Sequence, residues 1–185
     1  MARHYDVPWR TSGSLGGAKT FDAQAGYESA ATLSAVIHSG ANYIWHAAGW
    51  NEAGMHCSVA KFIVDAEQCA MAYRMAEGPR WDDFDEGLAA IRDVGPGGHY
   101  LGHPHTQENF QRAFFMPETF DNNSIEQWKA EGEVEITERA LGIARKLLSE
   151  YQEPALDPAK NEALLDYVAR REREIPAADA LNQDY

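Results

Sequence analysis

Basic residues are scarce in this sequence, and long apolar runs are missing from it. Its 16 Lys and Arg residues stand against 29 Asp and Glu residues, which gives a formal net charge of −13. Such an excess of negative charge disfavours a nucleic-acid backbone or an anionic membrane surface as a partner. The first residues, "MARHYDVPW", lack an apolar signal core, and no run approaches the roughly 18 apolar residues of a membrane span. We therefore expect a soluble, cytoplasmic protein that binds neither nucleic acid nor membranes.

The chain holds only two cysteines, Cys57 and Cys69, and they do not form a CxxC pair. Thiols spaced in this way are typical of reduced side chains in a reducing compartment, and they do not indicate a disulfide framework. The 185 residues, 44% of them hydrophobic, are enough for one full core. The composition gives no reason to expect a second core.

Predicted strands and helices alternate through the first 78 residues. Short strands are predicted at 7–12 and 41–49, and helices run from the N-cap Asp22 to Gly40 and over 59–78. This alternation predicts a parallel α/β arrangement. Because the second strand is apolar at nearly every position, we expect it to be covered on both faces, which requires neighbouring strands. These elements resemble the closing portion of something larger.

The helix over 59–78 carries apolar residues at helical spacing, and we expect them to form its buried stripe. The predicted members of this stripe are Val59, Phe62, Ile63, Ala66, Cys69, Ala70 and Tyr73. Residues 51–58 are expected to form a loop. Helices dominate the rest of the chain. They are predicted at 84–95, from an N-cap at Thr106 to Met116, after a capping box of Ser124 and Gln127, over 134–152, and from Asp157 onward.

Six stretches of the sequence resemble the trimethylamine methyltransferase (MttB-like) superfamily. They are "ARHYDVPWRTSG", "AKTFDAQAGYESAATL", "HAAGWNEAGM", "FIVDAEQCAM", "DVGPGGHYLGHPHT" and "FMPETFDNNSIEQWKAEG". These stretches follow the order of the family from residue 2 to residue 132, and the later helices fit the C-terminal tail of the family. The likeness therefore covers most of the chain.

The resemblance implies a fold as well as a function. Members of the family are similar to a TIM barrel and are longer than this chain, and an ordinary barrel needs about 250 residues. The expected fold is therefore α/β, as the C-terminal part of a TIM (β/α)8-type barrel followed by a helical tail. Residues 1–120 would supply late strands and helices of the partial barrel, and residues 121–185 would pack on it as the tail. A homo-oligomer or a missing N-terminal barrel segment would complete the structure.

The family reaction, as the resemblance implies it, moves a methyl group from an amine nitrogen to the reduced cobalt of a corrinoid (cobalamin). A separate corrinoid protein presents that cofactor, so the chain itself is expected to bind none directly. The trimethylamine branch is associated with pyrrolysine, which this sequence lacks; we expect the equivalent position between Leu15 and Asp22. A quaternary amine is already a good leaving group. The favoured substrate is therefore a quaternary methylamine such as a betaine, with a tertiary methylamine as the other option.

A methylated cation is bound by aromatic faces, because ring quadrupoles attract alkylammonium groups. Tyr43, Trp45 and Trp50 lie on or just after the second predicted strand, and the C-terminal ends of barrel strands face the active site. We therefore predict Trp50, Asn51, Tyr43 and Trp45 as substrate-binding residues and Glu52 as a catalytic residue. Two alternatives stay open: Tyr43 and Trp45 pack against outer helices, and Glu52 is an exposed loop carboxylate.

Gln24 and Glu28 lie one helical turn apart, so their side chains can meet near the start of a helix that follows a barrel strand. We predict that they shape the substrate site, or that they contact the corrinoid protein. Asp22, just before them, is most simply an N-cap.

Three histidines, His99, His103 and His105, fall within seven positions. An HxH pair is typical of metal-dependent hydrolases, but Pro104 and the predicted cap at Thr106 indicate a loop corner. The other histidines are scattered and complete no ligand set: His4, His38, His46 and His56. We therefore predict no metal site. His99 and His105 are predicted catalytic residues that donate hydrogen bonds to the substrate carboxylate or to backbone carbonyls; purely structural roles are the alternative.

Three functions follow from the sequence. The first is a corrinoid-dependent amine methyltransferase, or a fragment or subunit of one, with a cognate corrinoid protein and a small methylated amine as its partners. The second is a non-catalytic fragment or assembly partner of the same family. The third is a metal-dependent hydrolase that uses the HxH pair.

Overall fold

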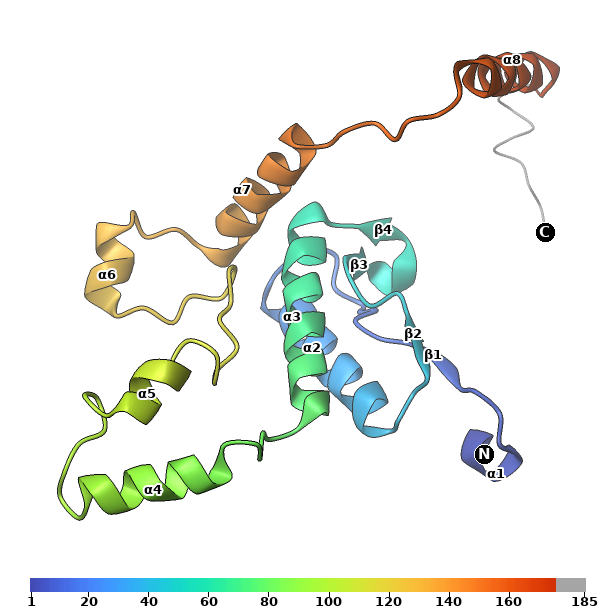
Figure 1. Ribbon diagram of the computed structural model, residues 1–185. Helices are drawn as coiled ribbons and strands as arrows, with labels where there is room; N and C mark the ends of the chain where they lie inside the picture. The colour runs from blue at the N-terminus through green and yellow to red at the C-terminus, as the bar shows by residue number, and fades with distance from the viewer. Residues whose placement is uncertain (176–185) are drawn as a thin grey trace. The chain divides into compact units, whose positions relative to one another are not determined.

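The computed structural model describes residues 1–175. Contacts divide the chain into two compact units, Met1–Ser149 and Glu150–Tyr185. The first unit contains two small sheets and helices α1 to α7, and the second contains α8 (Figure 1). The sequence predicts a different division, between a partial barrel at 1–120 and a tail at 121–185. The contacts within the chain do not test that division, so it stays a prediction.

A parallel β–α–β unit opens the first unit. β1 (Arg10–Ser12) and β2 (Tyr43–Trp45) lie side by side, with Ser12 opposite Trp45. The helix α2 (Ala23–His38) connects the two strands (Figure 1). A parallel pair joined by a helix confirms the predicted α/β class.

The predicted start of α2 is also confirmed. The Asp22 carboxylate accepts a hydrogen bond from Ala25 N at 3.1 Å, which satisfies one of the free N–H groups in the first turn. The helix ends before Gly40, whose φ of +74° suits glycine.

The predicted burial of residues 41–49 on both faces is wrong. Only Tyr43–Trp45 form a strand, and the Tyr43 and Trp45 side chains are 59% and 48% exposed. Ile44, between them, is half-buried beside Leu33 of α2. The physical reason is the width of the sheet. In residues 1–175 this strand pairs with β1 alone, and a two-stranded sheet leaves part of its surface uncovered.

The stretch predicted to be a loop at 51–58 contains a small antiparallel hairpin. β3 (Trp50–Asn51) pairs with β4 (His56–Cys57), and the 3-10 turn η1 (Glu52–Gly54) joins them. Two-residue strands rich in polar and small residues have no periodicity that a sequence pattern can detect.

The helix α3 (Val59–Glu77) confirms the predicted helix, and Ser58 caps its first turn by accepting from Lys61 N. The predicted stripe is wrong, because Phe62 and other predicted members are exposed. The buried residues of α3 are Ala60, Lys61, Val64 and Asp65. A lysine and an aspartate one turn apart compensate each other's charge, so this face can be buried although a hydrophobicity pattern assigns it to solvent.

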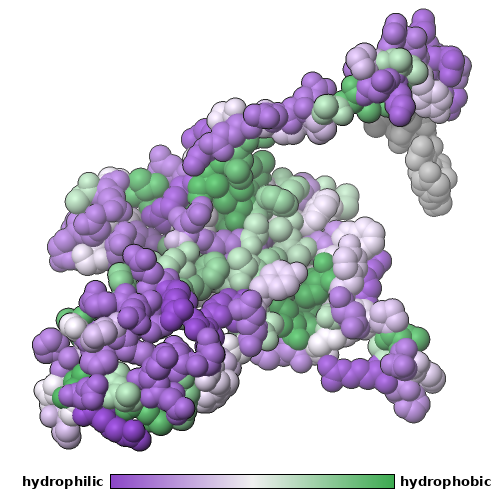
Figure 2. Space-filling model, in the orientation of Figure 1, coloured by the Kyte–Doolittle hydropathy of each residue, from purple (hydrophilic) through white to green (hydrophobic). Residues whose placement is uncertain are grey.

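The core of the first unit lies where α7 (Ile136–Ser149) packs on α3. Its buried members are Ala60, Val64 and Ala140. Partly buried apolar residues surround them: Phe21, Ile63, Phe120, Ile136 and Leu141. Apolar surface over α7 and along α3 marks this region in Figure 2. Small residues at the contact let the two helices approach closely.

Glu67 on α3 holds the segment 118–120 against the core. Its carboxylate accepts hydrogen bonds from Thr119 N at 2.9 Å and Phe120 N at 3.2 Å, and also from Glu118 N and the Thr119 hydroxyl. Arg139 of α7 donates to the Thr119 carbonyl from the other side. One segment is therefore attached to both core helices through polar contacts.

The remaining helices are short or lie away from the core. They are α1 (Ala2–Tyr5), α4 (Phe84–Val94), α5 (Pro104–Asn109) and α6 (Ile125–Ala130). The predicted cap Ser124 is confirmed by its bond from Gln127 N, at 3.3 Å. The predicted cap Thr106 is wrong. His103 caps α5 instead, because Pro104 opens the helix and the His103 Nδ1 atom accepts from His105 N.

The second unit contains α8 (Pro158–Glu174), which confirms the helix predicted from Asp157 onward, and Asp157 caps it by accepting from Lys160 N at 3.1 Å. No residue of α8 is buried within the described part of this unit, residues 150–175. Among the helices of residues 1–175, none is long and apolar enough to cross a bilayer.

Candidate functional site

Aromatic side chains gather along β2, beside β1, and in the segment that follows the end of β2. We call this group the strand-end cluster; it comprises Arg10, Ser12, Tyr43, Trp45, His46 and Trp50. The ring centroids of Tyr43 and Trp45 are 6.1 Å apart, and those of His46 and Trp50 are 5.5 Å apart at 88°. The guanidinium carbon of Arg10 lies 4.8 Å from the centroid of the Trp45 ring. Ligands of parallel α/β sheets bind at this end of the strands.

His46 is held in an unusual backbone conformation. Its φ is +53°, and its Nδ1 atom lies 3.2 Å from the Ser12 hydroxyl at the end of the neighbouring strand. Its ring also lies 5.6 Å from the Trp45 ring. A positive φ at a residue other than glycine costs free energy and is commonly found where function requires it.

A second group, which we call the loop cluster, surrounds the glycine-rich segment after β1. It comprises Lys19, Gln24, Glu28, Glu52 and His56. Glu28 accepts from Gln24 Nε2 at 2.8 Å and from Ala18 N at 3.0 Å. The side-chain bond from Gln24, followed by the Ala18 amide, lowers the pKa of the Glu28 carboxyl. Glu28 is therefore an ionised acceptor that orders the loop.

Glu52 lies on the other side of the same loop. Its backbone N donates to the Ala18 carbonyl at 2.9 Å, and its carboxylate is 3.9 Å from Lys19 Nζ and 3.5 Å from His56 Nδ1. The Glu52 side chain is about half exposed, so these ion pairs are weak and the carboxylate remains accessible. The alternative of an exposed loop carboxylate is thus compatible with its position.

Gly16 is required by this arrangement. A Cβ at position 16 would collide with Glu28 Oε2, the oxygen that binds Ala18 N. The Gly16 carbonyl accepts from Ala53 N at 2.8 Å, which attaches the loop to η1 as well. The backbone therefore passes very close to the Glu28 carboxylate.

The segment 50–52 joins the two clusters, since Trp50 belongs to the strand-end cluster and Glu52 to the loop cluster. Asn51, between them, is only 1% exposed, and neither polar atom of its side chain has a hydrogen-bond partner within residues 1–175. A buried amide without a partner is costly, so this group has unused capacity to bind a polar group.

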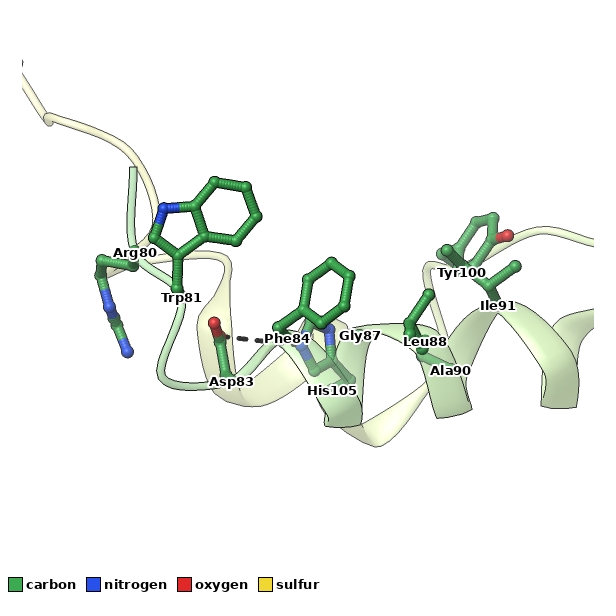
Figure 3. Close-up of a pocket in the computed structure, with 10 residues that line it drawn as sticks. All are labelled: Arg80, Trp81, Asp83, Phe84, Gly87, Leu88, Ala90, Ile91, Tyr100 and His105. Carbon is green, nitrogen blue, oxygen red and sulfur yellow. Dashed lines mark ion pairs between the residues drawn. The ribbon is translucent and has the colours of Figure 1, made fainter. Parts of the chain in front are cut away.

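The histidines of the HxH pair stabilise a different part of the molecule. His105 Nε2 lies 3.8 Å from Asp83, at the start of α4, and His103 Nε2 lies 3.7 Å from Asp93, near its end. His105 also lines a pocket of about 400 Å³ with Trp81, Phe84 and Tyr100, among others (Figure 3). The two imidazoles contact separate carboxylates, and residues 1–175 contain no group of three potential ligands that could hold a metal ion.

The structure brings some predicted residues together and separates others. Gln24, Glu28 and Glu52 meet around one loop, Tyr43 lies next to Trp45, and the His46 ring lies between Trp45 and Trp50 in a series of ring contacts. His99 is exposed ahead of α5, and His105 contacts α4. In the described part of the chain, no hydrogen bond, ion pair or ring contact joins either histidine to the two clusters. Their predicted catalytic roles stay predictions.

Sequence reasoning missed several members of the clusters. The sequence does not predict Arg10, Ser12 and Lys19 as site residues, and it indicates His46 and His56 only as scattered histidines. Strand register places Ser12 next to His46, and no local pattern encodes that register. Arg10 is the first residue of β1, and no local pattern predicts that its guanidinium lies over the Trp45 ring.

Comparison with known proteins decides the family. The family described as "Trimethylamine methyltransferase (MTTB)" matches residues 1–176. The chain belongs to the trimethylamine methyltransferase family. The resemblance noted in the sequence is thereby confirmed.

Three relatives of this chain illustrate the range of substrates named within the family. The glycine betaine methyltransferase of Desulfitobacterium hafniense strain Y51 is 38% identical over 95% of this chain and 36% of its own length. The L-carnitine:corrinoid methyltransferase of Eubacterium limosum is 30% identical over 83% of the chain and 32% of its own length. The trimethylamine methyltransferase MttB of D. hafniense strain DCB-2 is 28% identical over 98% and 36%. The chain therefore spans about a third of these relatives.

Proposed function

We propose that this chain is part of a corrinoid-dependent methyltransferase that demethylates a quaternary methylamine, with a betaine as the favoured substrate. The single observation that carries the proposal is the strand-end cluster. Three exposed or half-buried aromatic rings lie on β2 or after it: Tyr43 begins the strand, Trp45 ends it, and Trp50 follows in β3. The family membership of the chain and the names of its relatives support the same reaction class.

The strand-end cluster suits a permanent cation. A quaternary ammonium cannot donate a hydrogen bond, so ring faces are its best partners, and each contributes roughly 0.5–2 kcal/mol. Arg10 lies beside the same rings and supplies a positive charge that a carboxylate can bind. A zwitterion with an ammonium at one end and a carboxylate at the other matches both features. Trimethylamine has no carboxylate for Arg10 to bind.

The chain would also contribute order and polarity next to the substrate. The loop cluster fixes residues 16–19 through Glu28, and Glu52 adds an accessible carboxylate. Asn51 offers unused hydrogen-bonding capacity beside Trp50. Gln24 and Glu28 order the loop from the helix side, and in this proposal they would thereby shape the substrate site.

The chemistry itself requires little from protein side chains. A corrinoid carried by a partner protein supplies the nucleophile, and the amine leaves as a neutral molecule with the electron pair of the broken C–N bond. This chain would bind the cation, orient one methyl group outward and exclude water. In this proposal, residues 1–120 form late strands and helices of a TIM-type barrel whose remaining strands lie elsewhere.

Calorimetric binding of glycine betaine to the full chain tests the proposal. The neutral-headed isostere 3,3-dimethylbutanoate has the same shape and carboxylate but no positive charge, so we expect it to bind at least about tenfold more weakly. Trp50→Leu should weaken betaine binding about 2- to 30-fold, because one ring contact is lost.

Trp81→Leu is the matched control, since Trp81 contacts Phe84 at α4 and belongs to neither cluster. It should leave betaine binding unchanged. Equal affinities for betaine and its isostere, or equal losses in both tryptophan variants, would contradict the proposed site.

A further inference from the structure

We infer that the buried Lys61–Asp65 pair of α3 is a positioning device, which we call the brace, that holds the backbone at the ends of β1 and β2 for the cation site. The inference rests on the proposed function for what the site binds. The contacts of the brace do not depend on what the site binds. The experiment therefore distinguishes failure of the brace from failure of the proposed function.

The brace contacts both loops directly. Lys61 Nζ lies 2.5 Å from Asp65 Oδ2, and the two side chains are 0% and 3% exposed. Lys61 Nζ also donates to the Ser14 carbonyl at 3.0 Å, two residues after β1 ends. Asp65 Oδ2 accepts from Gly49 N at 2.9 Å, one residue before Trp50. A single ion pair thus binds the backbone that follows each strand.

Stability alone does not account for such a pair. Removing two charges from water is costly, and well-packed apolar residues of similar size often stabilise a core as well or better. α3 buries Ala60 and Val64 on the same face, so methionine and leucine would suit this environment. What apolar residues could not supply is a donor for Ser14 O and an acceptor for Gly49 N.

The two backbone positions lead directly into the two clusters. Ser14 precedes the loop 16–19 that Glu28 and Glu52 bind. Gly49 precedes Trp50 and has a φ of +82°. A Cβ at Gly49 would lie 2.8 Å from Cys57 Sγ and 2.9 Å from Phe62 Cβ, so the chain approaches α3 here only as glycine. A shift of either loop would move an aromatic ring or a carboxylate of the proposed site.

Two double variants remove the charges together and avoid leaving one buried charge alone. K61M/D65L removes both backbone contacts, whereas K61M/D65N keeps an acceptor for Gly49 N. On α3 itself, R74M/E77L is the matched control, because it removes the exposed Arg74–Glu77 pair far from both loops. Thermal unfolding, betaine binding and amide hydrogen exchange are measured for all four proteins.

We expect K61M/D65L to unfold within a few degrees of the wild type but to bind betaine at least tenfold more weakly. Exchange at the Gly49 amide should accelerate at least tenfold. K61M/D65N should retain slow exchange at Gly49 and lose less affinity than K61M/D65L. The control should match the wild type in affinity and in exchange.

Unchanged betaine affinity and unchanged hydrogen exchange at Gly49 in K61M/D65L would overturn the proposed positioning role of the brace. Fast exchange at Gly49 in the wild type would overturn it as well, and this measurement needs no variant to fold. If no protein, the wild type included, binds betaine, the proposed function fails. The exchange data then still decide whether the brace holds the loops.

Discussion

Individual residues at the site adopt backbone conformations that their side chains disfavour. His46, Glu52 and Ala53 have φ values of +53°, +49° and +54°, although none of them is glycine. Surrounding contacts must hold such residues in place, and strain of this kind gathers where a precise geometry matters. His46 lies within the strand-end cluster, and Glu52 within the loop cluster. Two further residues of the described chain with positive φ, Asp6 and Glu133, belong to neither cluster, so the strain is concentrated at the proposed site but not confined to it.

Ala53 offers a test of that strain that leaves every functional side chain intact. Ala53→Gly should raise the free energy of unfolding by about 0.5 kcal/mol, because relief of the left-handed conformation outweighs the added flexibility of glycine. Chemical denaturation measures the change. Ala66→Gly is the matched control: Ala66 is an exposed residue within α3, and the same substitution there should lower stability by about 1 kcal/mol. Equal effects at the two positions would rule out strain at Ala53.

Residue-level prediction succeeded where a contact is local and failed where it is not. Asp22 and Ser124 were correctly predicted as caps and Asp157 as a helix start, and each of the three binds a backbone N–H three residues ahead. The burial of Lys61 and Asp65 could not be predicted from apolar spacing. Their i, i+4 spacing was visible, but only the packed structure shows that this pair faces inward.

At the scale of elements, polar side chains attach loops to helices throughout the first unit. Glu67 binds the segment 118–120 to α3, and the brace binds the strand ends to the same helix. Burial acts to raise the pKa of Glu67, but the hydrogen bonds from the Thr119 hydroxyl and from the N–H groups of 118–120 outweigh it, and the net pKa is lowered. Glu67 therefore favours the folded state only while it is ionised.

The lowered pKa of Glu67 fixes the direction of a pH dependence. The stabilisation is complete above the ordinary glutamate pKa of 4.5 and is lost as the pH falls through the lower value of the folded state. Glu67→Gln should lower the free energy of unfolding at pH 7 by about 1–3 kcal/mol, because the N–H groups of 118–120, of which that of Thr119 belongs to a buried residue, lose a charged acceptor. Urea denaturation at pH 7 and at pH 3 measures the difference.

The difference between wild type and Glu67→Gln should shrink markedly at pH 3, since the wild-type carboxylate is then increasingly protonated. Glu77→Gln, on the exposed part of the same helix, controls for the loss of one negative charge. If the wild type exceeded Glu67→Gln in free energy of unfolding by the same amount at both pH values, ionisation of Glu67 would not contribute to its contact with the segment 118–120.

The positions of the helices and strands along the chain were largely predictable, but which of their faces are buried was not. Helical periodicity and glycine stops located α2, α3 and α4, whose last turn ends at Gly95 as expected. The exposure of Tyr43 and Trp45 depends on how many strands surround β2, which is a property of the sheet and not of its sequence. The Thr106 cap failed because Pro104 starts α5 earlier.

On the scale of the whole molecule, this chain matches about a third of each of the relatives named above. The aromatic rings of β2 are exposed, and the sheet of β1 and β2 has two strands in the described residues. Both features are consistent with a set of strands that a larger barrel would complete. The C-terminal ends of the strands would then face a shared mouth.

A chimera tests the hypothesis that this chain supplies strands of a larger barrel. We expect a D. hafniense glycine betaine methyltransferase whose matching 36% is replaced by this chain to fold and to demethylate glycine betaine. The measurement is dimethylglycine formation with reduced cobalamin as the methyl acceptor. Trp50→Leu within the chimera should reduce kcat/KM about 2- to 30-fold, because the ring stabilises the bound cation.

The Trp81→Leu chimera is the corresponding control and should retain full activity. A folded chimera that produces no dimethylglycine would contradict the betaine assignment and leave the family membership intact. A chimera that is equally active with and without Trp50 would exclude that ring from the site.

The backbone at Gly16 lies so close to the Glu28 carboxylate that the evolution of these two positions should be linked. A side chain gained at 16 would displace the carboxylate at 28 from the Ala18 amide, so the loop would lose one of its attachments to α2. As long as glutamate stays at 28 in this contact, position 16 is therefore expected to stay glycine.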